Sequence, residues 1–154
     1  MKHLSILLIG TLLSASVGCG ATLYDAAETV VDVSGKAVHE SYKFYSKDYE
    51  RAASEALEAV NTIVEFDAAM KLHNELGSIF AIATATHEQL VLALDIWDRT
   101  GDAENFIEVA SCLVEVLALV RDSLNKLGIT AADGLFDKVF SLASKFIEGK
   151  SCHG

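Results

Sequence analysis

The apolar residues of this chain recur at intervals of three and four positions over most of its length. The first such series runs from Leu23 to Leu76. This spacing turns one side of an α-helix toward a core and leaves the other side to water. A single helix of that length would measure about 80 Å, so we expect a kink or a break near Ser34-Gly35 or around residues 46–48.

Capping and turn residues predict where the following helix begins and ends. Gly77 is expected to end the first region, although residues 79–85 could continue it. Thr86 and Gln89 have the spacing of a capping box, in which two side chains bind the first free amides of a helix. We therefore predict a second helical region from Thr86 to Gly101. Glycine suits the left-handed conformation of the residue that follows a helix.

The last two helices are predicted in the same way. One is expected to start at Asp102 and to end at Gly128, and the wide apolar face of residues 106–120 makes it the predicted central helix. A Thr-x-x-Asp pattern at Thr130 then predicts a last helix that runs to Gly149.

These elements together predict the fold class. The last three helices have short connections, which make neighbouring helices antiparallel. The chain has no Pro and 10 Gly, so it lacks the regular turn residues of a β protein. We expect an all-α fold, a four- or five-helix bundle with short antiparallel connections, in a single domain of residues 19–154.

Charge excludes one class of partner and argues against a membrane span. The formal net charge of −10 repels phosphate, so no nucleic-acid partner is expected. The apolar stretch closest to the length of a span is residues 106–120. It contains Glu108 and Glu115, which are costly at the centre of a bilayer, so a buried core helix is predicted there.

The first residues follow a different pattern from the rest. Lys2 precedes an apolar run, Leu4–Leu13, and small residues lead from there to Gly18. This order is typical of a secretory signal peptide, and the apolar run rises only about 15 Å as a helix, too short to cross a membrane. We expect residues 1–18 to be cleaved from the chain.

The end of this segment, Ser16–Cys19, resembles the lipobox of prokaryotic lipoproteins. The resemblance implies that Cys19 becomes the first mature residue and carries the lipid, and its two or three acyl chains would anchor the chain stably. Ser16 stands where this class usually has Leu. Ordinary cleavage near Gly18 or Ala21 is the alternative.

The other two cysteines lie at matching heights of the predicted bundle. Cys112 is about 24 Å before the turn at Gly128, and Cys152 is about 28 Å after Asp133 on the antiparallel neighbour. Disulfides persist in an oxidising compartment, so we predict a Cys112–Cys152 bond, worth about 4 kcal/mol by chain entropy. The alternatives are two free thiols or, without lipidation, competition from Cys19.

One cluster mixes aromatic and basic residues and is the candidate interaction patch: Tyr42, Lys43, Phe44, Tyr45, Lys47 and Tyr49. Core or rim packing is the ordinary interpretation of such aromatics. A contact surface is the other, because Tyr is enriched at protein interfaces and the lysines are locally positive on an acidic chain. Exposure of the cluster would favour the contact surface.

Motifs for chemistry are weak. No His-Glu-x-x-His or Glu-x-x-His pair occurs, so no metal or other cofactor is predicted. Ser123 and Lys126 match the Ser-x-x-Lys spacing of penicillin-recognising enzymes, but the companion motifs are missing. We predict no catalytic residues and no enzyme activity.

These patterns favour a small envelope lipoprotein that acts as a membrane-tethered helical interaction module. An Asp directly after the lipidated cysteine would resemble the inner-membrane retention signal of many enteric bacteria, and this chain has Gly20 there. The expected location is therefore the outer membrane, facing the periplasm. Its expected partners are membrane lipid, through acylated Cys19, and an unknown envelope protein. A bacteriophage protein of the superinfection-exclusion type would look similar. The alternatives are a periplasmic carrier of a small apolar ligand or lipid and, more weakly, an enzyme of unrecognised type.

Overall fold

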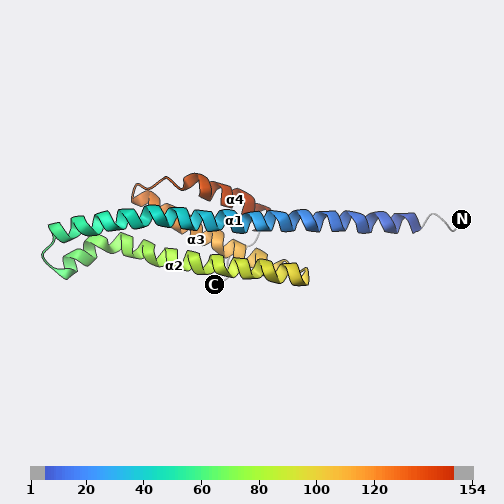
Figure 1. Cartoon of the computed structure of the whole chain (residues 1–154), viewed down its shortest axis with the longest axis horizontal. Helices are drawn as coiled ribbons and strands as arrows, with labels where there is room; N and C mark the ends of the chain where they lie inside the picture. Colours follow the sequence, from blue (N-terminus) through green and yellow to red (C-terminus); the bar gives the residue numbers. More distant parts are fainter. Residues whose placement is uncertain (1–5, 148–154) are drawn as a thin grey trace.

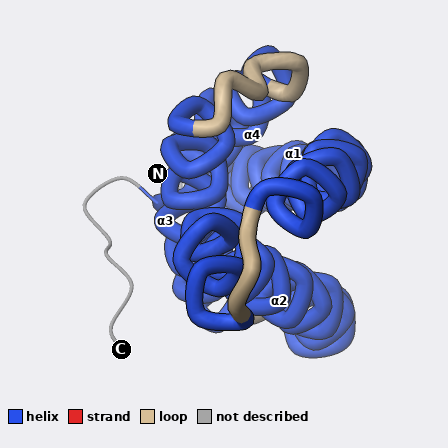
Figure 2. The backbone as a smooth tube through the Cα atoms, turned by 90° about the vertical axis from the view of Figure 1, so that its left-hand side faces the viewer, coloured by secondary structure: helices blue, strands red, loops and turns tan. Residues whose placement is uncertain are grey.

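The computed structural model describes the backbone of residues 6–147 and the side chains of residues 23–147. Within this range the chain forms four helices and no strand: α1 (Ile6–Ala59), α2 (Ile63–Thr100), α3 (Glu104–Lys126) and α4 (Asp133–Ile147). α1 and α3 each pack against both α2 and α4, as the views along and across the helices show (Figures 1 and 2). The predicted all-α bundle is confirmed, with four helices.

The expected break in the first region is wrong. α1 is a continuous helix of 54 residues that passes through Ser34-Gly35 and through residues 46–48. Its length fits because its N-terminal part extends beyond the other three helices (Figure 1). The chain turns instead after Ala59, where the Thr62 hydroxyl and the Glu65 carboxylate form a capping box for α2.

Two further predicted boundaries, at Gly77 and at Thr86, are also wrong. α2 continues through both Gly77 and Thr86. The Thr86 hydroxyl donates to the carbonyl of Ile82, one turn earlier, so it does not cap a new helix. The Thr-x-x-Gln pattern therefore predicted a helix start that does not exist, because the Thr86 hydroxyl binds a carbonyl of its own helix instead of capping a new one.

The predicted helix ends at Gly101 and Gly128 are confirmed, and the end predicted at Gly149 lies outside the described residues. Gly101 has a φ of 75° and donates its amide to Trp97 over 2.8 Å. Gly128 has a φ of 76°, and the Ile129 amide donates to Leu124 over 2.9 Å, which is the long bond of a Schellman cap. Both glycines occupy left-handed positions that a residue with a Cβ adopts only with strain.

The end of the bundle nearest the N-terminus holds a cluster to which every helix contributes an aromatic ring. Phe106 of α3 is fully buried, 5.4 Å from the ring of Trp97 of α2 and 5.7 Å from that of Phe146 of α4. Tyr24 of α1 packs edge-on against Trp97 at 5.6 Å. We call this four-helix region the bundle end. The core continues from it along α3, which confirms residues 106–120 as a buried core segment.

At the opposite end α1 and α2 continue as a pair beyond α3 and α4 (Figure 1). We call residues 46–75 of this pair the hairpin end. Its buried residues, Ala56, Met70 and His73, lie outside the main core cluster. Ile63 and Val64, near its turn, are among the most exposed apolar side chains of the described part.

Candidate functional site

A tyrosine and a glycine fix the height of α1 against α2 near the hairpin end. The Tyr45 hydroxyl is buried and donates to the backbone carbonyl of His73 over 2.8 Å. A Cβ placed at Gly77 would lie only 2.8 Å from that hydroxyl oxygen. Gly77 is therefore a notch in α2 that receives the head of the Tyr45 side chain, and burial raises the pKa of this phenol, which favours its donating form.

A histidine and a second glycine repeat this arrangement in the opposite direction. The His87 ring of α2 lies against Gly35 of α1, and its Nε2 is 3.0 Å from the carbonyl oxygen of Val31. In both contacts the accepting carbonyl lies four residues before the glycine. Each helix thus receives one polar side chain from the other, and the two contacts together set the register of α1 on α2.

Between these two contacts the surface is hollowed along the line where α1 and α2 meet. Three adjoining hollows share Tyr42, and the two largest have volumes of about 690 Å³ and 520 Å³. We call this surface the aromatic groove. Its lining from α1 consists mainly of Tyr42, Tyr45 and Tyr49, and its lining from α2 of Gly77, Phe80, Ala81, Thr84, Ala85 and Glu88.

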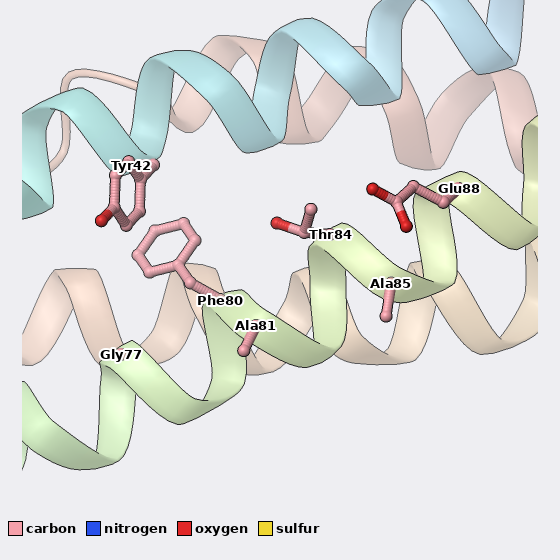
Figure 3. Close-up of a pocket in the computed structure, with 7 residues that line it drawn as sticks. All are labelled: Tyr42, Gly77, Phe80, Ala81, Thr84, Ala85 and Glu88. Atoms are coloured by element: carbon pink, nitrogen blue, oxygen red, sulfur yellow. The ribbon is translucent and has the colours of Figure 1, made fainter.

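Tyr42 is the exposed centre of the groove. Half of its side chain, 51%, is open to solvent. Its ring stands edge-on to Phe80 with centroids 5.4 Å apart, and Figure 3 shows this pair at one end of the hollow with Thr84 and Glu88 further along α2. The small residues of α2 leave room beside the rings, which produces the hollow.

The candidate interaction patch is divided by the fold. Its three tyrosines line the groove, although Tyr45 is buried and Tyr49 is half-buried against the ring of His73. The other three residues do not line it: Lys43 pairs with Glu40 over 2.9 Å, while Phe44 and Lys47 are exposed elsewhere on α1. The patch is therefore partly core and partly surface.

The α2 side of the groove was missed from the sequence. Its residues, from Gly77 to Glu88, follow Tyr42 by 35 to 46 positions in the chain, so no local pattern joins them. A usable signal was the four-residue spacing of Gly77, Ala81 and Ala85, which predicts a flat stripe on a helix where another group approaches closely.

A polar network lies beneath the hairpin side of the groove. Asp48 Oδ2 is 3.0 Å from His73 Nε2, and Arg51 also binds this carboxylate. Burial raises the pKa of Asp48, but the hydrogen bonds from Arg51 and His73 outweigh it, so the pKa lies below the usual value of 3.8. Within the described part His73 Nδ1 is buried and has no partner.

The chemistry of the groove is that of a binding surface. Its walls offer aromatic rings, methyl groups and hydroxyls, and Glu50 and Glu88 add negative charge at its edges. Apolar side chains pack well on such walls, and basic groups would be attracted to its edges. Among the described residues no group of three or more His, Cys, Asp and Glu side chains could hold a metal ion.

The remaining candidate residues concern the two ends of the chain. Cys112 takes part in a disulfide bond, whereas Cys152 lies outside the described residues, so their pairing stays a prediction. The side chain of Cys19 also lies outside them, and lipidation there stays a prediction. Within the described helices α2, and not residues 106–120, is the one long and apolar enough to cross a membrane by length and composition.

No protein-family model matches the chain, and searches of curated proteins and of solved structures found no match.

Proposed function

We propose that the protein is a small envelope lipoprotein that works as a membrane-tethered interaction module, with the aromatic groove as its docking surface. The observation that carries this proposal is the half-exposed ring of Tyr42 above a hollow between two helices of fixed register. Exposed tyrosines beside a preformed hollow are the usual anchors of protein interfaces.

The shape and charge of the groove favour one kind of partner. The hollows follow the direction of α1 and α2, are open to solvent along their length and carry Glu50 and Glu88 at their edges. An amphipathic helix with apolar side chains and flanking basic residues would fit this surface. An open groove suits such a helix better than it suits an enclosed small ligand, so the carrier function has less support.

The tether would act at a fixed distance from this surface. Cys19 and Tyr42 lie on the same continuous helix, about 35 Å apart along its axis. With acyl chains on Cys19, the groove would stay close to the membrane without a flexible linker. A superinfection-exclusion protein encoded by a bacteriophage would act in this way, by occupying an envelope protein from the side of the membrane.

The test is photocrosslinking in intact membranes from position 42. A photoreactive phenylalanine analogue at Tyr42 should capture a discrete envelope protein, and Glu88→Lys should reduce that capture because it reverses a charge at the groove edge. The matched control is the same analogue at Phe44, which is exposed but does not line the groove. Equal capture from both positions would contradict the groove.

The tether has its own measurement. Mass spectrometry of the mature protein should show a Cys19 that carries acyl chains at the first residue. A mature N-terminus without lipid would contradict the lipoprotein assignment and would leave the groove to be judged by crosslinking alone.

A further inference from the structure

The outward face of α2 is low in charge although the chain is strongly acidic. Between Glu75 and Asp95 the helix carries a single formal charge, at Glu88, in a chain of net charge −10. One stripe of this face is exposed along its whole length and consists of Ser78, Ala81, Ala85, Gln89, Leu92 and Ile96. Leu92 is 62% exposed, which is unusual for a leucine in the middle of a folded bundle.

The two halves of this stripe differ in size. The first half has only small side chains, at Ser78, Ala81 and Ala85, and the second half has the larger ones of Leu92 and Ile96. The small half is thus a shallow depression and the large half a ridge, both on the same side of the same helix. Such a surface is complementary to itself when a second copy is turned end to end.

Positions along the helix show how well the halves match. In an antiparallel pair centred at the level of His87, Ile96 falls opposite Ser78 of the second copy and Gln89 falls opposite Ala85. Leu92 falls beside Ala81 in the same pairing. Every large side chain of the stripe therefore meets a small one, and helices joined by small residues approach closely.

The charges at the two ends of α2 agree with the same pairing. Lys71 and Arg99 are exposed, one near each end of the helix. In the antiparallel arrangement Lys71 comes near Asp102 of the second copy, and Arg99 comes opposite Glu75. Lys71 already pairs with Glu75 of its own helix and Arg99 with Asp95, so the contacts between copies would add to existing pairs of opposite charge.

We propose that two copies of this chain associate through the outward face of α2, antiparallel and with twofold symmetry. The proposal goes beyond the aromatic groove but shares Ser78, Ala81 and Ala85 with its lining, so a second copy on this face would compete with an envelope partner in the groove. It explains why a helix that packs in a bundle is also apolar enough to cross a membrane. A lipid surface fits this face less well, because α2 has no Lys or Arg between Lys71 and Arg99 and interfacial helices bind anionic lipid through such residues.

The first test is crosslinking between copies in the native membrane. Ser78→Cys and Ile96→Cys are placed on separately tagged copies of the full chain, which are expressed together and oxidised with copper phenanthroline. A covalent dimer that contains both tags is expected, and little dimer when either variant is present alone, because equal positions lie far apart in an antiparallel pair. Leu119→Cys in place of Ile96→Cys is the matched control, since Leu119 is 56% exposed but lies on α3.

The second test separates this contact from a general effect of surface polarity. Leu92→Glu in both copies should lower the crosslinking yield by about tenfold or more, because it places two charges in an apolar contact. Ala81→Leu should also lower it, and Ala81→Leu combined with Leu92→Ala in one chain should restore it. That rescue is expected only if residue 81 of one copy touches residue 92 of the other.

Three results would overturn the proposal. The first is a yield with Leu119→Cys that equals the yield with Ile96→Cys. The second is no recovery in the combined Ala81→Leu and Leu92→Ala chain. The third is efficient labelling of the α2 face by a photoactivatable phosphatidylethanolamine with no crosslink between copies, which would assign the face to lipid.

Discussion

The bundle end and the hairpin end of this molecule are built from the same two long helices but are held together differently. At the bundle end four helices enclose the fully buried ring of Phe106 and a continuous apolar core. At the hairpin end two helices cannot surround a core, and polar contacts from Tyr45 and Asp48 to His73 join them. Where burial is small, directional contacts must set the register, because apolar packing alone tolerates sliding.

The largest effect is expected from the core of the bundle end. Phe106→Ala should lower the free energy of unfolding by about 3–5 kcal/mol, since it leaves a cavity between the rings of Trp97 and Phe146. Urea unfolding followed by circular dichroism measures this change. Phe44→Ala, on a ring that is 37% exposed, is the control and should cost less; equal losses would remove the distinction between core and surface aromatics.

The predicted disulfide is expected to support the same end of the molecule. Cys112→Ser and Cys152→Ser should each lower the free energy of unfolding by about 2–4 kcal/mol, because both open the same loop of the unfolded chain. Both variants should also lose the same shift in mobility on non-reducing gels. A shift lost in one variant and kept in the other would show that Cys112 is bonded to another cysteine.

A smaller change in the free energy of unfolding is expected at Gly77, and its sign should depend on whether the Tyr45 hydroxyl is present. Gly77→Ala should destabilise the protein by about 1–3 kcal/mol, because the new Cβ would stand 2.8 Å from the Tyr45 hydroxyl. In a Tyr45→Phe background the same substitution should stabilise by up to about 1 kcal/mol, because alanine favours a helix over glycine and the hydroxyl is gone. Urea unfolding of the four proteins in the cycle measures both signs.

If Gly77→Ala destabilises both backgrounds equally, the notch does not exist. Gly101→Ala is a useful comparison, since nothing lies within 4 Å of a Cβ there and only its φ of 75° resists the change.

The smallest effect is a pH dependence of the hairpin end. Because the folded pKa of Asp48 lies below its unfolded value, this residue contributes stability above about pH 4, and that contribution is lost as the pH falls through the folded pKa. Asp48→Asn should therefore lower the free energy of unfolding at neutral pH. The stability of this variant should also fall less than that of the unmodified protein as the pH is lowered. The urea midpoints of both proteins from pH 7 to pH 2.5 should converge at low pH. Parallel curves would mean that Asp48 does not titrate differently in the folded state.

The sequence predicted the parts of the fold that depend on neighbouring residues. Helical periodicity and the glycines at positions 101 and 128 are confirmed, because a helix and its caps are made of contacts within a few positions. The burial predicted for residues 106–120 is confirmed as well. The same local rules gave false boundaries at Gly35, Gly77 and Thr86. There, each residue has a helical conformation and a neighbour or a hydrogen bond that the local pattern does not show.

The candidate site was predictable only in part for the same reason. Three of the six patch residues do line a surface hollow, and the structure shows that Tyr42, which the sequence named only as a member of the patch, is half exposed. The α2 wall that makes the hollow was not predicted, because residues 77–88 meet Tyr42 only after the chain reverses at Ala59.

The sequence by itself determined that this protein is helical, strongly acidic and divided by two left-handed glycines, because hydrogen bonds between near neighbours and the number of charges do not depend on distant contacts. Only the tertiary structure decided that the first helix runs unbroken and that two glycines serve as notches for the side chains of a neighbouring helix. It also decided which apolar residues are left outside the core. Those properties depend on which helix lies beside which, and that choice is made by packing over the whole chain.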